Sequence, residues 1–178
     1  MIESSGRVAY VLMRVLFRLR DLIWPPDRAL GRMGLGPGQT FLDYGFGPGS
    51  YALAAARIVG PAGRVYAVDV NGLAVERLRR AAGRAGLANV TAILADSPAG
   101  LAGCGADLAL LHDVLHELED PAGVLAGLAR ALKPGGVLAV SDHHMKESEI
   151  VSAVTAAGPF DLLRSFRGVH CFRRSGGE

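Results

Sequence analysis

Glycines and acidic residues gather where short apolar runs end, and residues of these types could bind a polar ligand there. The run that ends at Asp43 is followed by glycines at alternate positions, Gly45, Gly47 and Gly49. Glycine lets the backbone turn sharply and lie close against a ligand, and the amides that open a following helix would face that ligand. The next apolar run ends at Asp69, where a carboxylate can accept hydrogen bonds from both hydroxyls of a ribose.

Taken alone, this pattern has plainer interpretations. Several nucleotide-binding folds and many structural turns contain a glycine-rich connection between a strand and a helix. A third apolar run ends before Asp96 and Ser97, and both Asp69 and Asp96 could simply cap the helices that follow. Capping and ligand contact are compatible, however, because ligands bind at the carboxyl edge of an open parallel sheet.

Histidines follow two later strands of the pattern. His112, Asp113 and His116 come after the fourth predicted strand, and Asp142, His143 and His144 come after the fifth, so a metal ligand set or a general base could be assembled from them. If these strands are neighbours, both groups emerge at the same edge of the sheet, where a general base could come from His112, His116 or His143. A metal site is not expected, because no ligand spacing such as H-E-x-x-H is present.

Length and composition limit the class of protein. The 178 residues suit one domain of ordinary size, and a chain that is 50% apolar and 20% charged is globular rather than disordered. A net charge of +2 gives no argument for binding nucleic acid. The two cysteines, Cys104 and Cys171, are too few for a disulfide framework or a four-thiolate zinc site. Their scarcity fits a reducing compartment, so we expect a cytoplasmic protein.

The elements that must position these residues alternate between strands and helices from residue 40 onward, which is typical of a parallel sheet. Two C-terminal strands are joined so closely around Arg167-Gly168 that they must pair antiparallel. The expected fold is a three-layer α/β sandwich, with a Rossmann-like seven-stranded sheet whose last strand is reversed. The predicted strands are Thr40–Asp43, Arg64–Asp69, Val90–Ala95, Asp107–His112, Gly136–Asp142, Phe160–Phe166 and Val169–Arg173.

Helices between these strands are predicted from capping residues and from apolar residues at helical spacing. One helix follows Asn71. Another begins at Asp120, keeps Leu132 on its inner face, and stops over residues 133–136, where Lys-Pro-Gly-Gly breaks the helix. A third covers Glu147–Ala157.

The sequence resembles the class I S-adenosylmethionine-dependent methyltransferases over residues 36–175. The D-x-G-x-G-x-G run at Asp43–Gly49, Asp69 at the end of the second strand, and Asp96-Ser97 after the third fit that family in order and spacing. The segments Val114–Pro121 and Leu132–Gly136 are similar to two segments common in small-molecule methyltransferases. Together these motifs are far more specific than any one of them.

The resemblance implies transfer of a methyl group from S-adenosylmethionine to a small-molecule acceptor by in-line displacement. The glycine turn would pass under the methionine part of the cofactor, Asp69 would bind the ribose, Asp96 with Ser97 beside it would bind the adenine amino group, and His112 would face the sulfonium. Tyr44 replaces a commoner small residue of the family and could narrow the site. The cofactor-binding residues implied are Asp43, Tyr44, Gly45, Gly47, Gly49, Asp69, Val70, Asp96, Ser97 and His112.

Two other functions compete with this one. A nicotinamide-dependent oxidoreductase would carry a glycine where Ser50 stands, and it would not need Asp43 before the first glycine. A non-catalytic partner or regulatory subunit could keep the methyltransferase fold, with or without the cofactor. The short connection between the fifth strand and Glu147–Ala157 favours this second alternative, because many relatives build their acceptor pocket there.

The first 35 residues differ in character, and we expect a helical lid segment at 1–35 ahead of a cofactor-binding domain at 36–178. Apolar residues recur at helical spacing over 8–23 beside an arginine-bearing face, and a second short helix is expected at Asp27–Met33. The stretch carries too many charges to span a bilayer, and it does not have the pattern of a signal peptide. It could close the cofactor cleft, as in many relatives, or lie weakly on an anionic membrane surface.

Overall fold

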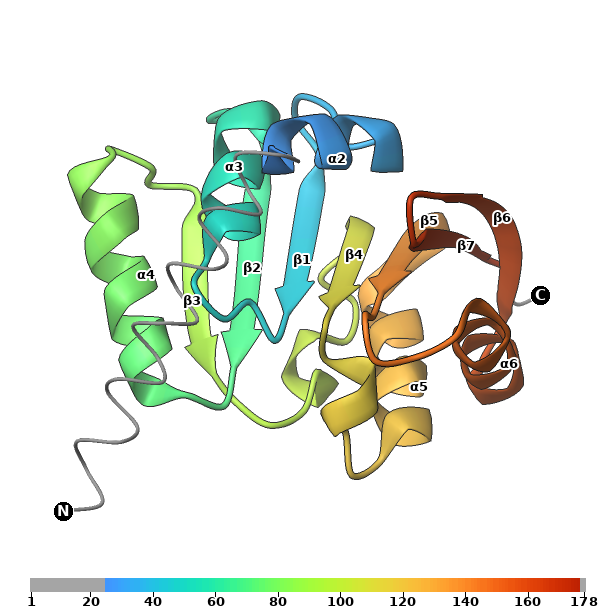
Figure 1. The fold of residues 1–178 in the computed structure, drawn as a ribbon. Coiled ribbons are helices and arrows are strands. Elements are labelled where there is room, and N and C mark those ends of the chain that lie inside the picture. The colour runs from blue at the N-terminus through green and yellow to red at the C-terminus, as the bar shows by residue number, and fades with distance from the viewer. Residues whose placement is uncertain (1–24, 177–178) are drawn as a thin grey trace, which may run out of the picture.

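The computed structural model describes residues 25–176, which form a seven-stranded sheet with helices on both faces (Figure 1). The strand order is β3-β2-β1-β4-β5-β7-β6. Strands β1 to β5 run parallel, whereas β7 is antiparallel to both β5 and β6, so the predicted sheet with its reversed last strand is confirmed. The strands are β1 (Thr40–Tyr44), β2 (Arg64–Asp69), β3 (Val90–Leu94), β4 (Ala106–His112), β5 (Leu132–Ser141), β6 (Phe160–Phe166) and β7 (Val169–Arg174).

The strand order reverses between β1 and β4. From β1 the chain moves outward through β2 to β3, then returns to the other side of β1 and continues through β4 to β5. Ligands bind at the carboxyl ends of the strands beside such a reversal, because the two connections leave in opposite directions and open a crevice. The glycine turn leaves β1 and the histidines leave β4 and β5, so the candidate residues share this edge.

The helices pack against the sheet in two layers, each with its own apolar core. Neighbouring residues of a strand face opposite sides, and accordingly Phe41 joins the core under α2, α3 and α4 while Leu42 joins the core under α5 and α6. The helices are α2 (Pro26–Met33), α3 (Ser50–Val59), α4 (Gly72–Arg84), α5 (Pro121–Ala131) and α6 (Glu147–Ala157), with short 3-10 turns at η1 (Ala99–Leu101) and η2 (Leu115–Glu117).

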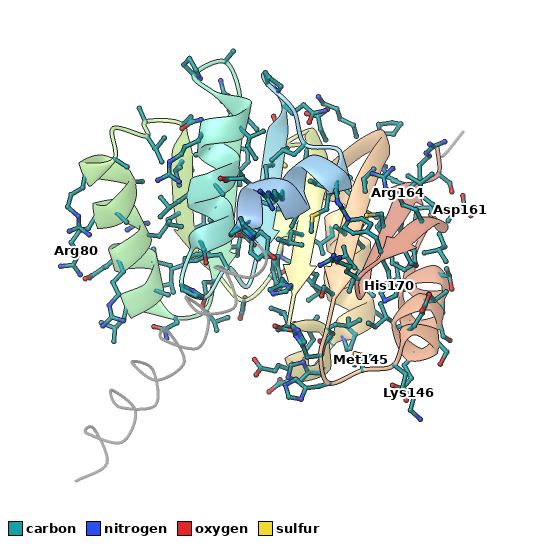
Figure 2. The ribbon with its side chains drawn as sticks, turned by 45° about the horizontal axis from the view of Figure 1, so that its top comes forward. Arg80, Met145, Lys146, Asp161, Arg164 and His170 are labelled. Carbon is teal, nitrogen blue, oxygen red and sulfur yellow. The ribbon has the colours of Figure 1, made fainter. Side chains whose placement is uncertain are left out.

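The predicted helix caps are present. The Asn71 side chain accepts hydrogen bonds from two amides of the first turn of α4, and Asp120 accepts one from Gly123 at the start of α5. On α4, Arg80 points away from the sheet into solvent, as Figure 2 shows, and pairs with Glu76 at 3.1 Å. These contacts fix where α4 and α5 begin, and therefore where the loops after β2 and β4 end.

The predicted boundary between the helix after Asp120 and the fifth strand is wrong, because β5 begins at Leu132 rather than at Gly136. Helix α5 ends at Ala131, and Leu132, which we expected on its inner face, is the first residue of β5 and pairs with Ala106. The reason is Pro134, which lacks an amide hydrogen and disfavours helical backbone at the residue before it. The chain therefore turns into the strand one residue earlier than the apolar spacing indicated.

The short helix α2 contributes to the apolar core that it shares with α3 and α4. Its residues Ala29, Leu30 and Met33 are buried, and it packs against α3. Arg164 of β6 donates a hydrogen bond of 2.9 Å to the Arg32 carbonyl at the end of this helix. The amphipathic stretch predicted at 8–23 lies outside the described residues. Within residues 25–176, no helix is both long and apolar enough to cross a membrane.

Candidate functional site

The glycine turn between β1 and α3 requires glycine for two different reasons. Gly45, Gly47 and Gly49 all have positive φ, at 72°, 52° and 81°, where other residues are strained. A Cβ at Gly45 would lie 2.4 Å from Val114, and one at Gly49 would lie 2.9 Å from Leu78. A Cβ at Gly47 would meet no atom within 4 Å. The two outer glycines therefore allow close packing, whereas the middle one borders open space.

Asp69, at the end of β2, holds this turn in place. Its Oδ2 accepts a hydrogen bond of 2.9 Å from the Gly47 amide, and its Oδ1 accepts one of 2.8 Å from the Asn71 amide. The carboxylate thus links the glycine turn to the start of α4. The glycine turn and Asp69 therefore lie at the same edge of the sheet, as expected.

Asp43 is a buried acid with one oxygen left over. The residue is 2% exposed, and among the described residues its Oδ2 finds no hydrogen-bond partner. Burial, followed by repulsion from Asp69, raises the pKa of this carboxyl to about 7, although a hydrogen bond from the Ala52 amide opposes the rise. A cationic ligand at this edge would give Asp43 the partner that no described residue supplies.

Tyr44 connects β1 to the loop after β3. Its side chain is buried, and its hydroxyl donates a hydrogen bond of 2.7 Å to the Asp96 carbonyl. Burial, with smaller contributions from Asp96 and Asp69, raises the pKa of the Tyr44 hydroxyl, which keeps it a donor. Ser97 accepts a hydrogen bond from the Ala99 amide at the start of η1. Tyr44 therefore fixes the position of the loop that carries Asp96 and Ser97.

Three large apolar side chains are exposed beside these acids. Val70, Leu73 and Leu94 are 70%, 59% and 58% exposed, and they follow β2, open α4 and end β3, respectively. Sequence reasoning named Val70 but missed Leu73 and Leu94, because one looked like an ordinary helix residue and the other like an interior strand residue. An exposed apolar patch on a soluble domain usually marks a contact surface, here suited to a flat ring.

The histidines after β4 and β5 are held by carboxylates across the boundary between these strands. Asp113, after β4, contacts Nδ1 of His143 at 2.5 Å and accepts a hydrogen bond from its amide at 3.0 Å. In the opposite direction, Asp142, after β5, contacts Nδ1 of His116 at 2.8 Å and accepts a hydrogen bond from its amide at 3.1 Å. The two loops are therefore joined by reciprocal His–Asp pairs.

The electrostatics of the two pairs differ. Although burial acts to raise the pKa of Asp142, hydrogen bonds from His116 and from the His144 amide leave it below the ordinary value. Asp113 instead has a left-handed backbone, with φ of 54°, and its amide donates a hydrogen bond of 2.7 Å to the Ser141 carbonyl. A non-glycine residue in this conformation is strained, and such residues cluster at functional sites.

His112 lies between the glycine turn and His143. Its ring centroid is 5.0 Å from that of Tyr51, in the first turn of α3, and 6.0 Å from that of His143. Its Nε2 is 3.4 Å from Asp113. The structure thus brings His112, Asp113 and His143 together, next to the turn after β1.

A cavity of about 280 Å³ opens on the far side of Asp142, between α6 and the hairpin of β6 and β7. Met145, from the loop before α6, and His170, from β7, line it; both are labelled in Figure 2. His170 is buried, with Nδ1 at 2.9 Å from the Ser165 hydroxyl, which also contacts Glu147 at 3.3 Å. No sequence pattern indicated this cavity, apart from the mixture of polar and apolar residues in β6 and β7.

Other predicted features take no part in this site. Within residues 25–176, no group of three or more histidine, cysteine, aspartate or glutamate side chains is arranged to hold a metal. Cys171 is buried in the core, and Cys104 donates to the Ala131 carbonyl from a half-buried position. Asp113 and Asp142, which directly follow β4 and β5, were expected at this edge together with the histidines, but the sequence did not show which histidine each one pairs with.

Comparison with known proteins agrees with the geometry. A family profile described as "Methyltransferase domain" matches residues 35–161. The chain is similar to a structure described as a SAM-dependent methyltransferase from Aquifex aeolicus, with 26% identity and a TM-score of 0.80, covering 87% of this chain and 92% of the other.

Two further relatives act on different kinds of acceptor. The chain is 39% identical over 120 residues to "Ribosomal protein L11 methyltransferase" of Dechloromonas aromatica (strain RCB), covering 66% of this chain and 36% of the relative. It is 41% identical over 70 residues to "Probable cobalt-precorrin-6B C(15)-methyltransferase (decarboxylating)" of Sulfolobus acidocaldarius, covering 39% and 36%. The chain spans about a third of the length of these two relatives. From the family match, the fold and the site, we conclude that this chain belongs to the methyltransferase-domain family, whose cofactor is S-adenosylmethionine.

Proposed function

We propose that this chain transfers the methyl group of S-adenosylmethionine to a small-molecule acceptor. The observation that carries the proposal is the Asp43 carboxyl, which is buried at the start of the glycine turn with an oxygen that no described residue satisfies. S-adenosylmethionine carries two positive groups, the ammonium of its methionine part and the sulfonium. Either charge near Asp43 would favour the ionised carboxylate, so the residues present fit this cofactor.

The remaining cofactor contacts follow from the same edge of the sheet. Gly47 would face the methionine part, because a ligand can approach its backbone without meeting a side chain. Asp69 would bind the ribose hydroxyls, and Val70 with the other two exposed apolar residues would cover the adenine, near Asp96 and Ser97. His112 would stand at the sulfonium end, between Tyr51 and His143.

The bound cofactor supplies a methyl group already activated for displacement by the sulfonium charge. The chain then has to orient an acceptor in line with that methyl group and exclude water from the reacting atoms. No side chain has to become covalently attached. The cavity beside Asp142 is the proposed seat of the acceptor.

The size of that cavity supports a small acceptor. Its volume of about 280 Å³ is near the lower end of small-molecule pockets, and its lining combines apolar side chains with a few polar groups. The L11 methyltransferase among the relatives is named for a protein acceptor, so a macromolecular acceptor is the alternative that an experiment has to exclude.

Calorimetry followed by turnover tests the proposal. S-adenosylmethionine and S-adenosylhomocysteine should both bind to the full chain at one site, and absence of binding by both would refute it. Release of S-adenosylhomocysteine should then be measured with a panel of phenols, hydroxy compounds and amines, and with ribosomal protein as a macromolecular acceptor. Binding without turnover on any acceptor would favour the non-catalytic alternative.

A pair of substitutions tests the acceptor seat separately. Ser165→Trp places a large ring in the cavity from β6, whereas Leu162→Trp adds the same bulk to an exposed position of the same strand outside the cavity. We expect Ser165→Trp to raise KM for the acceptor at least tenfold and to leave the affinity for S-adenosylhomocysteine unchanged. Equal effects of the two substitutions would remove the acceptor from this cavity.

A further inference from the structure

Three of the four histidines at the ends of β4 and β5, His112, His116 and His143, are candidates for taking a proton from an acceptor. An acceptor that carries a proton on its nucleophilic atom has to lose it, and an imidazole can accept it near neutral pH. A base needs one nitrogen oriented by a partner and the other accessible to the acceptor. The contacts of each ring decide which histidine meets both conditions.

His112 and His116 are poorly placed for this role. The His112 side chain is only 14% exposed, and its ring is packed between those of Tyr51 and His143. In His116, Nδ1 is on Asp142, Nε2 is 3.6 Å from Glu117, and the ring centroid is 4.3 Å from that of His144. Both nitrogens of His116 therefore face carboxylates, so neither is open to an acceptor.

His143 meets both conditions. Its side chain is not part of the lining of the proposed acceptor cavity, but the residue directly follows Asp142, which is, and it is exposed at the same end of β5. Its Nδ1 is 2.5 Å from Asp113, and because a carboxylate only accepts hydrogen bonds, Nδ1 carries the hydrogen, which in the neutral ring leaves the lone pair on Nε2. The His143 side chain is 62% exposed, and among the described residues no partner of Nε2 is found. The strained backbone of Asp113 aims this carboxylate across the strand boundary, and Asp113 also reaches His112.

We infer that His143, oriented by Asp113, is the general base of the reaction, and that the acceptor carries its nucleophile as a hydroxyl, phenol or ammonium group. This inference rests on the proposed function. The acceptor's proton moves to Nε2 of His143 while its electron pair stays on oxygen or nitrogen. That pair forms the new bond to the methyl carbon as the carbon–sulfur bond breaks, and the sulfur keeps those electrons as a neutral thioether. The imidazolium, paired with Asp113, then returns its proton to water.

The charged groups around His143 are accounted for on both loops. Asp113 and His112 face it from the end of β4. On its own loop, Asp142 and His144 are engaged with His116 and with each other. The pH dependence of turnover can therefore be measured in variants of His143 and in variants of these neighbours, and the two sets can be compared.

The first test compares His143→Asn with His144→Asn, an adjacent exposed histidine outside the proposed machinery. With a weakly acidic phenol as acceptor, we expect His143→Asn to lower kcat at least 100-fold, the scale of general base catalysis, and His144→Asn to change it less than threefold. With 4-nitrophenol, which is ionised in alkaline assay buffer, the loss should be less than tenfold. A loss that does not depend on acceptor acidity would overturn the inference.

The second test needs no turnover. Diethyl pyrocarbonate acylates unprotonated, accessible imidazole nitrogens, and mass spectrometry locates the modified residue. At pH 9, well above the ordinary histidine pKa of about 6.5, we expect His143 to react faster than His144, and Asp113→Asn to slow His143 but not His144. No preference for His143 would overturn the inference, even if no acceptor were turned over. His143→Asn and Asp113→Asn should both bind S-adenosylhomocysteine as the wild type does. If the wild type itself did not bind S-adenosylhomocysteine, that result would count against the proposed function instead.

Discussion

Asp43→Asn should make the stability of this domain less dependent on pH. In the folded protein the pKa of Asp43 is raised from 3.8 to about 7, mainly by burial. Folding therefore favours the protonated acid. The stabilisation is complete below pH 3.8 and is lost as the pH rises through about 7, because the folded state must then ionise a buried carboxyl.

The size of this effect follows from the shift. Each pKa unit corresponds to about 1.4 kcal/mol, so the full shift corresponds to about 4 kcal/mol above pH 7. Between pH 5 and pH 8, linkage predicts that Asp43 alone costs about 2.5 kcal/mol of unfolding free energy. Asparagine has nearly the same shape and no charge, although its amide hydrogens leave an unsatisfied buried donor that costs about 1–3 kcal/mol at every pH.

Urea unfolding of the wild type and of Asp43→Asn, followed by circular dichroism at pH 5 and pH 8, measures this term. Other titrating groups contribute equally to both proteins and cancel in the difference. We expect the stability of the variant relative to the wild type to rise by about 2.5 kcal/mol from pH 5 to pH 8. Parallel pH dependence in the two proteins would show that Asp43 is ionised normally, and the argument for a cationic ligand would lose its basis.

Three further predictions concern the cofactor site and the N-terminal segment. Asp69→Ala should weaken binding of S-adenosylhomocysteine by about 1.5–3 kcal/mol in calorimetry, because it removes a charged acceptor for hydrogen bonds; normal affinity would place the ribose elsewhere. Gly47→Val should abolish binding in a folded protein, whereas Gly86→Val, which has a similar φ of 67° and open space at a loop far along the chain, should leave it intact; equal affinities would make the turn merely structural. Deleting residues 1–24 should weaken cofactor binding and remove most turnover if the segment is a lid. Flotation of the full chain, but not of the deletion, with anionic liposomes and unchanged cofactor affinity would instead indicate a membrane contact.

The fold and the glycine turn could be predicted because local requirements of the backbone determine their residues. The turn after β1 needs left-handed glycines, and a parallel sheet puts acids such as Asp43 and Asp69 at one edge whatever surrounds them. Such requirements are local in the sequence. The mistaken boundary at Leu132 came from giving apolar spacing more weight than Pro134: the helix was predicted one residue too long, and β5 begins at Leu132 rather than at Gly136.

The His–Asp pairs beside the proposed acceptor seat could not be predicted in the same way, because they form between the loop after β4 and the loop after β5. The sequence places His116 and His143 near the strand ends, yet it does not show that each is held by an aspartate of the other loop. Nor does it show that one oxygen of Asp43 has no hydrogen-bond partner among residues 25–176, which depends on all of its neighbours there. Side chains far apart in the chain decide both features, and only the packed structure brings them together.

Asp43 and His143 together determine how the pH dependence of activity has to be measured. If the cofactor's positive charge stabilises ionised Asp43, binding releases a proton and affinity rises as the pH passes through about 7. If His143 is the base, turnover also falls at low pH. The decrease of kcat/KM for the cofactor on the acid side of the pH profile therefore combines weaker cofactor binding with slower proton transfer. At saturating cofactor the binding contribution disappears, and kcat reports only groups in the loaded enzyme. An acid limb that persists in kcat for Asp43→Asn but is flattened in His143→Asn can therefore be assigned to the base.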